Sequence, residues 1–153
     1  MSEDNISNPS PTPSKGIPSN GWTLDHVGHA VESIEAALAF YTKHFGFEVE
    51  LTEELPEHKV DVAFLSLANT SIELIAPRAG NKTLRRFLDR RGPGLHHICF
   101  EVADIGAELV RLTAEGIRTV DAVPRPGSRS SSIAFLHPDS THGALIELCS
   151  YAK

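Results

Sequence analysis

The chain has 153 residues, 41% of them hydrophobic, which is enough for one domain with a core and too few for two ordinary domains. A formal net charge of −6 argues against a nucleic-acid-binding surface, and no apolar run approaches the length of a membrane span. We therefore expect one domain that acts on a small molecule and binds neither nucleic acid nor membrane.

The N-terminal segment differs in composition from the rest of the chain. Residues 1–20 are dominated by Ser, Pro and Asn, with too few apolar side chains to offset the entropy lost on ordering. We predict a disordered tail over 1–22, followed by a single domain over 23–152. The segment has neither the apolar core of a secretory signal nor the Arg-rich composition of a mitochondrial transit peptide, so we expect a cytoplasmic protein.

The first half of the domain predicts a βαβββ module over about 23–79. Residues 24–31 (LDHVGHAV) predict a strand, and 33–46 (SIEAALAFYTKHFG) predict a helix with Ser33 as its N-cap and Gly46 just past its end. Three more strands are predicted at 47–51, 60–68 and 71–77. A connecting helix is predicted over 81–92 (NKTLRRFLDRRG).

The second half repeats this order over about 94–151. A strand is predicted at 95–102 (LHHICFEV), a helix at 104–116 between Asp104 and Gly116, and strands at 117–121, 132–138 and 144–150. His26 precedes Glu73 by 47 residues, and His97 precedes Glu147 by 50. The sequence therefore predicts an α+β fold built from two βαβββ modules in one domain.

A doubled module brings matching positions together around a pseudo-twofold axis. Strands one and four of each half then deliver four polar side chains to one concave face: His26, Glu73, His97 and Glu147. Side chains alternate along a strand, so His96 faces the other way, against a helix or solvent.

Two buried imidazoles and two buried carboxylates are costly unless their desolvation is compensated, and a divalent cation does this by neutralising both acids. Mixed nitrogen and oxygen donors suit Co, Mn, Ni, Zn or Fe, and the residue types alone do not choose among them. We predict a metal site here rather than four core residues of unrelated roles.

Other polar residues leave alternatives open. We interpret Cys99 and Cys149 as free thiols that pack in the core, and five histidines without a repeat partner as surface or loop residues: His29, His44, His58, His137 and His142. A basic group is either a phosphate subsite or a solvated helix face: Arg78, Lys82, Arg85, Arg86, Arg90 and Arg91. The loop at 125–132, which contains Gly127 and Arg129, is either an ordinary turn or a flap that touches an anionic ligand.

These patterns resemble the vicinal oxygen chelate superfamily over about residues 23–151, and within it the methylmalonyl-CoA epimerase family. The narrower resemblance rests on LDHVGHAV at 24–31, LPEHKVDVAFLSLANTSIELIAP at 55–77, GLHHICFEV at 94–102 and FLHPDSTHGALIEL at 135–148. It implies a curved mixed sheet with helices outside. Glyoxalase I, a related family, usually has a different sequence motif where this chain has HPDSTHGALIEL at 137–148.

The resemblance implies a metal-dependent isomerase that interconverts (R)- and (S)-methylmalonyl-CoA by proton removal and return at C2. It implies His26, Glu73, His97 and Glu147 as metal ligands, cobalt as the first choice of metal with Mn, Ni, Zn or Mg as alternatives, and a homodimer. Glu147 is implied as a catalytic acid–base group, because inversion needs proton transfer on both faces of the carbon.

The match departs from the family at two places. Some relatives carry a glutamate on the third strand where this chain has Val62, which leaves the second proton-transfer group unassigned, and Ser130 stands where glycine is common. The alternatives are a glyoxalase I-like isomerase of a hemithioacetal and a non-catalytic binding module of the same fold.

Overall fold

A computed structural model describes residues 20–153 of the chain. Its elements follow in chain order: β1 (Thr23–Ala30), α1 (Ile34–Phe45), β2 (Glu48–Leu55), β3 (Val60–Ser66), β4 (Ser71–Pro77), α2 (Lys82–Arg91), β5 (Gly94–Glu101), α3 (Ile105–Ala114), β6 (Arg125–Pro126), the 3₁₀ turn η1 (Ser128–Ser130), β7 (Ser131–Leu136), the 3₁₀ turn η2 (Pro138–Ser140) and β8 (Ile146–Tyr151). Of the predicted tail over 1–22, only residues 20–22 lie within the described part.

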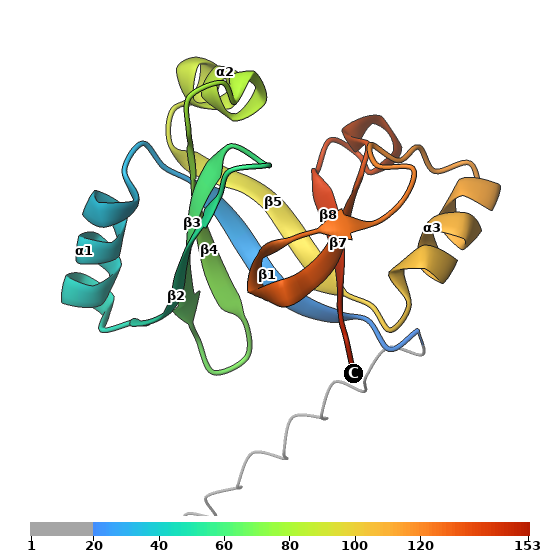
Figure 1. Ribbon diagram of the computed structural model, residues 1–153, viewed down its shortest axis with the longest axis horizontal. Helices are drawn as coiled ribbons and strands as arrows, with labels where there is room; N and C mark the ends of the chain where they lie inside the picture. Colours follow the sequence, from blue (N-terminus) through green and yellow to red (C-terminus); the bar gives the residue numbers. More distant parts are fainter. Residues whose placement is uncertain (1–19) are drawn as a thin grey trace, which may run out of the picture.

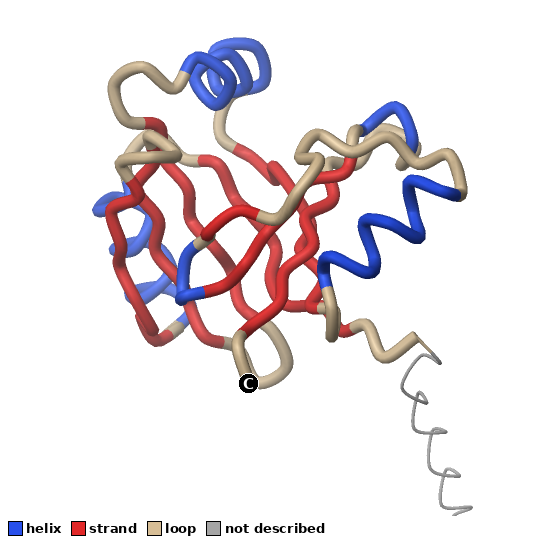
Figure 2. Tube along the Cα trace, turned by 45° about the vertical axis from the view of Figure 1, so that its right-hand side comes forward, coloured by secondary structure: helices blue, strands red, loops and turns tan. Residues whose placement is uncertain are grey.

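The eight strands form one mixed sheet that curls around a concave face (Figure 2). Their order is β2-β3-β4-β1-β5-β8-β7-β6. From the centre outward, each module therefore places its first strand, then its fourth, third and second. β1 pairs parallel with β4, β5 pairs parallel with β8, and the central pair β1 and β5 is antiparallel. The predicted fold of two βαβββ modules is confirmed, with the pseudo-twofold axis between β1 and β5.

Helices α1 and α3 pack at opposite sides of the molecule, one on each module, and α2 lies between the modules at one end (Figure 1). The apolar side of α1 packs on a cluster that contains Leu65 and Leu74. Leu109 and Leu112 of α3 pack on the equivalent cluster of the second half, with Leu148. Each helix therefore covers the convex face of its own module and leaves the concave face open for function.

The predicted helix ends are confirmed. Ser33 Oγ accepts a hydrogen bond from Ala36 N at 3.1 Å, and Asp104 Oδ1 accepts one from Ala107 N at 2.9 Å. Gly46 follows α1 in the left-handed conformation, with φ of 68°, which a residue with a Cβ adopts only at a cost. These local signals fix the lengths of the two module helices.

One predicted strand is wrong in position. Residues 117–121 form only an isolated bridge from Thr119 to Leu136, and the regular edge strand β6 lies later, at Arg125–Pro126. Backbone hydrogen bonds run from His137 N to Arg118 O at 2.9 Å and from Val120 N to Phe135 O at 2.8 Å. Phe135 N, however, donates to the side-chain Oδ2 of Asp121 at 2.8 Å rather than to a carbonyl, so the ladder does not continue.

Among residues 20–153, no helix is long and apolar enough to cross a bilayer.

Candidate metal centre

Four buried side chains meet at the middle of the concave face, one from each of the four central strands. They are His26 of β1, Glu73 of β4, His97 of β5 and Glu147 of β8, with 3 to 6% of each residue exposed. The structure thus brings together all four residues predicted from the repeat, and one donor atom from each lies within 4.8 Å of every other.

The distances between donor atoms are short. His26 Nε2 lies 3.1 Å from His97 Nε2 and 3.3 Å from Glu73 Oε2. His97 Nε2 lies 3.1 Å from Glu73 Oε2 and 3.2 Å from Glu147 Oε2, and His26 Nε2 lies 3.9 Å from Glu147 Oε2.

This arrangement fits a divalent cation. Donor atoms about 2.1 Å from one ion lie roughly 3.0 Å apart at a right angle and roughly 3.4 Å apart at the tetrahedral angle. Four of the five measured distances lie between 3.1 and 3.3 Å, so the donors surround a common point. Two nitrogens and two carboxylates are also a donor set that leaves coordination positions open for a chelating ligand.

Asp25 holds the first of the two histidines. A register shift between Leu24 and His26 inserts an extra residue, which lets Asp25 and His26 both direct their side chains to the concave face. Asp25 Oδ1 accepts a hydrogen bond from His26 Nδ1 at 2.6 Å, which directs Nε2 toward the other donors. Tyr151 Oη donates to Asp25 Oδ2 at 3.0 Å.

His96 holds the second histidine in the corresponding place. It packs edge-on against Phe87 of α2, with ring centroids 4.9 Å apart, as its predicted orientation toward a helix requires. The structure adds a contact that strand alternation did not predict: His96 Nδ1 lies 3.0 Å from His97 Nδ1. Burial and then the neighbouring His97 lower the pKa of His96 to about 4, so near neutrality it is uncharged. We assign His97 Nδ1 as the donor of this hydrogen bond, because His97 Nε2 is then free to bind a metal.

Two phenylalanines and one glycine complete the walls. Phe64 meets the ring of His26 edge-on at 5.3 Å, and Phe135 meets His97 in the same way at 5.7 Å. Gly28 lies opposite His97 across the β1–β5 pair, where an added Cβ would stand 2.2 Å from His97 Cε1. Sequence reasoning missed this glycine, because only the cross-strand register shows which side chain lies over it.

The site is strongly charged. Burial disfavours a charge on His26, but hydrogen bonds to Asp25 and Glu73 outweigh it and raise the pKa of His26 to about 10. Burial likewise opposes ionisation of Glu73, yet hydrogen bonds from His26 and His97 hold its pKa below the usual range. Burial raises the pKa of Glu147 to about 7, with the charge of Glu73 acting in the same direction. A cation that binds here must therefore displace protons.

Two thiols lie beside the centre but do not join it. Cys99 and Cys149 are free and buried, as predicted, and pack with Ile133. A hydrogen bond donated to Cys149, together with burial, raises the pKa of Cys99 well above its usual range, so it stays a thiol.

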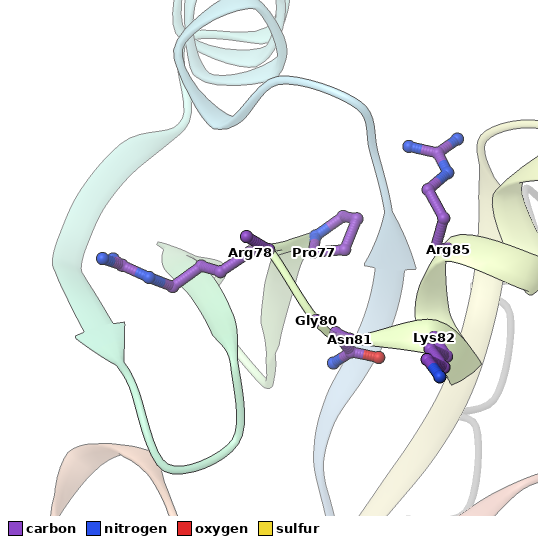
Figure 3. Close-up of a pocket in the computed structure, with 7 residues that line it drawn as sticks. Pro77, Arg78, Gly80, Asn81, Lys82 and Arg85 are labelled. Atoms are coloured by element: carbon purple, nitrogen blue, oxygen red, sulfur yellow. The ribbon is translucent and has the colours of Figure 1, made fainter.

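The predicted basic group lies around α2 and is partly neutralised within the protein. A cavity of about 410 Å³ lies at the start of this helix. Figure 3 shows the side chains of Arg78 and Arg85 extending in different directions beside it. Arg78 pairs with Asp61 at 2.7 Å, and Arg85 pairs with Glu32 at 2.6 Å. These ion pairs favour the reading of a solvated helix over that of a phosphate subsite.

The loop at 125–132 crosses to the first module. Arg129 Nη2 donates to Asp25 Oδ1, so the side chain reaches the residue that holds His26. His58, predicted to be a loop residue, contacts the other end of the loop: its Nε2 donates to Pro126 O at 2.7 Å, and its Nδ1 lies against Arg125. The two outer edges of the curled sheet are therefore in contact with each other.

The sequence pattern of the glyoxalase/bleomycin resistance protein/dioxygenase superfamily matches residues 25–135. The chain belongs to this superfamily. It is 40% identical over 127 residues to the ethylmalonyl-CoA/methylmalonyl-CoA epimerase of Cereibacter sphaeroides, covering 82% of this chain and 95% of that one. It is 38% identical over 126 residues to the mitochondrial methylmalonyl-CoA epimerase of Homo sapiens, covering 82% and 72%.

A solved structure of a methylmalonyl-CoA epimerase in complex with methylmalonyl-CoA and NH4+ superimposes with a TM-score of 0.81 at 34% identity, covering 85% of this chain and 94% of that one. These relatives confirm the predicted resemblance to methylmalonyl-CoA epimerases, and with it the assignment of this superfamily member to the epimerase-like isomerases.

Proposed function

We propose that the protein is a metal-dependent epimerase that interconverts (R)- and (S)-methylmalonyl-CoA. The observation that carries the proposal is the buried set of His26, Glu73, His97 and Glu147 around one point, in a chain whose relatives are named as epimerases of this substrate. A concave face with open positions beside these donors suits a small ligand that chelates through two oxygens.

The four side chains would hold one divalent ion, for which cobalt is our first proposal. When bound, such an ion neutralises the two carboxylates and stabilises by several kcal/mol the negative charge that develops on the substrate oxygens. Asp25 and His96 fix the orientation of the two imidazoles, and the rings of Phe64 and Phe135 exclude water from their edges.

Glu147 is the first proton-transfer group. Its carboxylate takes the proton from C2 or returns it as the carboxylic acid. Inversion needs a second group on the other face of C2. The third strand offers none, because Val62 is buried in an apolar cluster and Asp61 pairs with Arg78. Glu73, which the pseudo-twofold axis relates to Glu147, is our proposal for this second group.

Incubation of the metal-loaded protein with (2R)-methylmalonyl-CoA in deuterated water tests the function. We expect the C2 epimers to equilibrate and deuterium to enter at C2, at a rate well above that of a metal-free control. Equal exchange in the two samples would overturn the proposal. Isomerisation of the hemithioacetal of methylglyoxal without action on the CoA ester would replace it with the glyoxalase alternative.

The predicted homodimer and cytoplasmic location remain predictions.

A further inference from the structure

Arg129 crosses from the second module to the first and places a cation beside the candidate metal centre. Its guanidinium lies 4.0 Å above the ring of Phe64 and 5.6 Å from that of Tyr151. Nη2 donates to Asp25 and lies 3.4 Å from His26 Nδ1. The candidate metal-binding atom, His26 Nε2, is on the other side of the same imidazole ring. The side chain is only 16% exposed, so the charge is held inside the concave face.

Several donors of this guanidinium are not used. Within residues 20–153, Arg129 Nε is buried and has no hydrogen-bond partner. Nη1 forms an ion pair with Glu50, but Glu50 Oε1 is 3.7 Å away and beyond hydrogen-bond range, so within the described residues Nη1 makes no hydrogen bond. Buried donors without partners are rare in folded proteins and call for an explanation, such as a ligand.

The backbone of the loop directs this side chain inward. Arg129 and Ser130 both have left-handed φ values, 53° and 57°, which cost residues with a Cβ roughly 1–3 kcal/mol each. Arg129 N donates to Glu53 Oε2 at 3.3 Å, and Ser131 Oγ donates to Ser128 O at 2.8 Å, so the strained turn is tied at both ends.

We propose that Arg129 is a specificity-determining residue that binds the free carboxylate of the acyl group end-on, through Nη1 and the second N–H of Nη2. The inference rests on the proposed function, because it is the malonyl-type substrate that carries this carboxylate. A planar guanidinium binds a carboxylate end-on through two parallel hydrogen bonds from Nη1 and Nη2, and the other N–H of Nη2 remains on Asp25. Acyl-CoA esters that lack the second carboxylate gain nothing from this contact.

Arg125 provides a matched control. It lies on the same loop, and its guanidinium stands 5.7 Å from Phe135, the counterpart of Phe64 in the second module. Its donors are occupied, however: Nε donates to Asp121 at 3.0 Å and Nη1 contacts His58. If the loss of any positive charge on this loop weakened the binding of malonyl-CoA, Arg125→Gln and Arg129→Gln would therefore weaken it equally.

The experiment measures the dissociation constants of malonyl-CoA and acetyl-CoA, which differ by one carboxylate, by calorimetry on the cobalt-loaded protein. We expect the wild-type protein to prefer malonyl-CoA, and Arg129→Gln to reduce that preference by about 10- to 100-fold, on the scale of a charge-assisted hydrogen-bond pair. Acetyl-CoA affinity and metal content should stay within about twofold of wild type, and Arg125→Gln should keep the full preference.

Two results would overturn the inference. One is an Arg129→Gln variant whose preference for malonyl-CoA falls no more than that of Arg125→Gln. The other is a parallel loss of metal content and of affinity for both esters, which would mean that Arg129 acts only through Asp25. If Arg129→Gln does not fold, Arg129→Met keeps an unbranched chain against the two aromatic rings and is subject to the same criteria.

Failure of the proposed function is a separate result. It is seen as absent deuterium exchange at C2 in the wild-type protein, whereas the binding comparison needs no turnover.

Discussion

The two modules of the protein present the same donors and support them differently. Each gives one histidine and one glutamate to the centre, and each packs a phenylalanine against its histidine. Behind His26 stands an anion, Asp25, whereas behind His97 stands an uncharged imidazole, His96, at the matching position. The repeat therefore accounts for the four metal-donor residues, whereas Asp25 and His96, which hydrogen-bond to the two histidines, make the two halves of the site unequal.

The two arginines of the loop at 125–132 are unequal in the same way. Arg129 extends across the concave face with unused donors, whereas Arg125 is bound on its own side by Asp121. A symmetric site suits a reaction that inverts one carbon, since proton transfer is needed on both faces. The asymmetric surroundings suit a substrate whose two ends differ.

The largest expected effect comes from removing one glutamate at a time. Glu147→Gln and Glu73→Gln should each lower the rate of epimerisation by about 10²- to 10⁴-fold, the usual contribution of a proton-transfer group. If the two acids serve opposite faces, each variant should still exchange the C2 proton of one epimer, and the epimers should differ. Deuterium wash-in from resolved (R) and (S) substrate measures this.

Glu101 on β5 is exposed and offers a control substitution to Gln. Exchange of both epimers at wild-type rates in both centre variants would show that neither glutamate transfers the proton.

The second expected effect concerns metal affinity and the two residues that hydrogen-bond to the histidines, Asp25 and His96. Asp25→Asn should weaken metal binding by about 10- to 100-fold, because the carboxylate fixes the tautomer of His26 and increases its basicity. His96→Gln should cost less, since an amide oxygen can still accept from His97 Nδ1. Competition titration with a chromophoric chelator gives both affinities, and equal losses would contradict the proposed inequality.

A third comparison uses the residues that face the two histidines across β1 and β5. Gly28→Ala should destabilise the protein by about 1–3 kcal/mol and lower its metal content, because the new methyl group collides with the ring of His97. Cys99, which lies opposite His26, already carries a side chain there, so Cys99→Ser should leave the metal content unchanged. Denaturant unfolding and metal analysis test the pair.

The smallest expected effect is a pH dependence of the metal-free protein. Because the pKa of His96 is lowered from 6.5 to about 4, its contribution to folding stability is full above pH 6.5 and is lost as the pH falls through 4. Between pH 6.5 and 5.5 the wild-type protein should lose about 1 kcal/mol more than His96→Phe does. Parallel unfolding curves over this range would contradict the assignment of a neutral His96.

Much of the fold and the donor set could be predicted from the sequence. The repeat spacing located the four donors, since matching places in two modules must converge, and the side chains of Ser33 and Asp104 marked helix starts by a purely local rule.

The supporting residues could not be predicted, because they depend on register between strands distant in sequence. Three such features leave no periodic signal in the sequence. They are the bulge that turns Asp25 inward, the packing of His97 over Gly28 and the contact of Arg129 with Asp25 across the concave face. The misplaced edge strand has a similar origin, since the side chain of Asp121 takes the hydrogen bond of Phe135 N and stops the backbone ladder after the bridge at Thr119.

The central claim is that one histidine and one glutamate from each module bind a single divalent ion. Elemental analysis of natively purified protein, repeated after incubation with Co²⁺ and removal of the excess, tests it most directly. We predict one ion per chain in the wild-type protein and almost none in a His26→Gln/His97→Gln double variant that still folds. A wild-type protein that takes up no ion, or a double variant that retains it in full, would contradict the account.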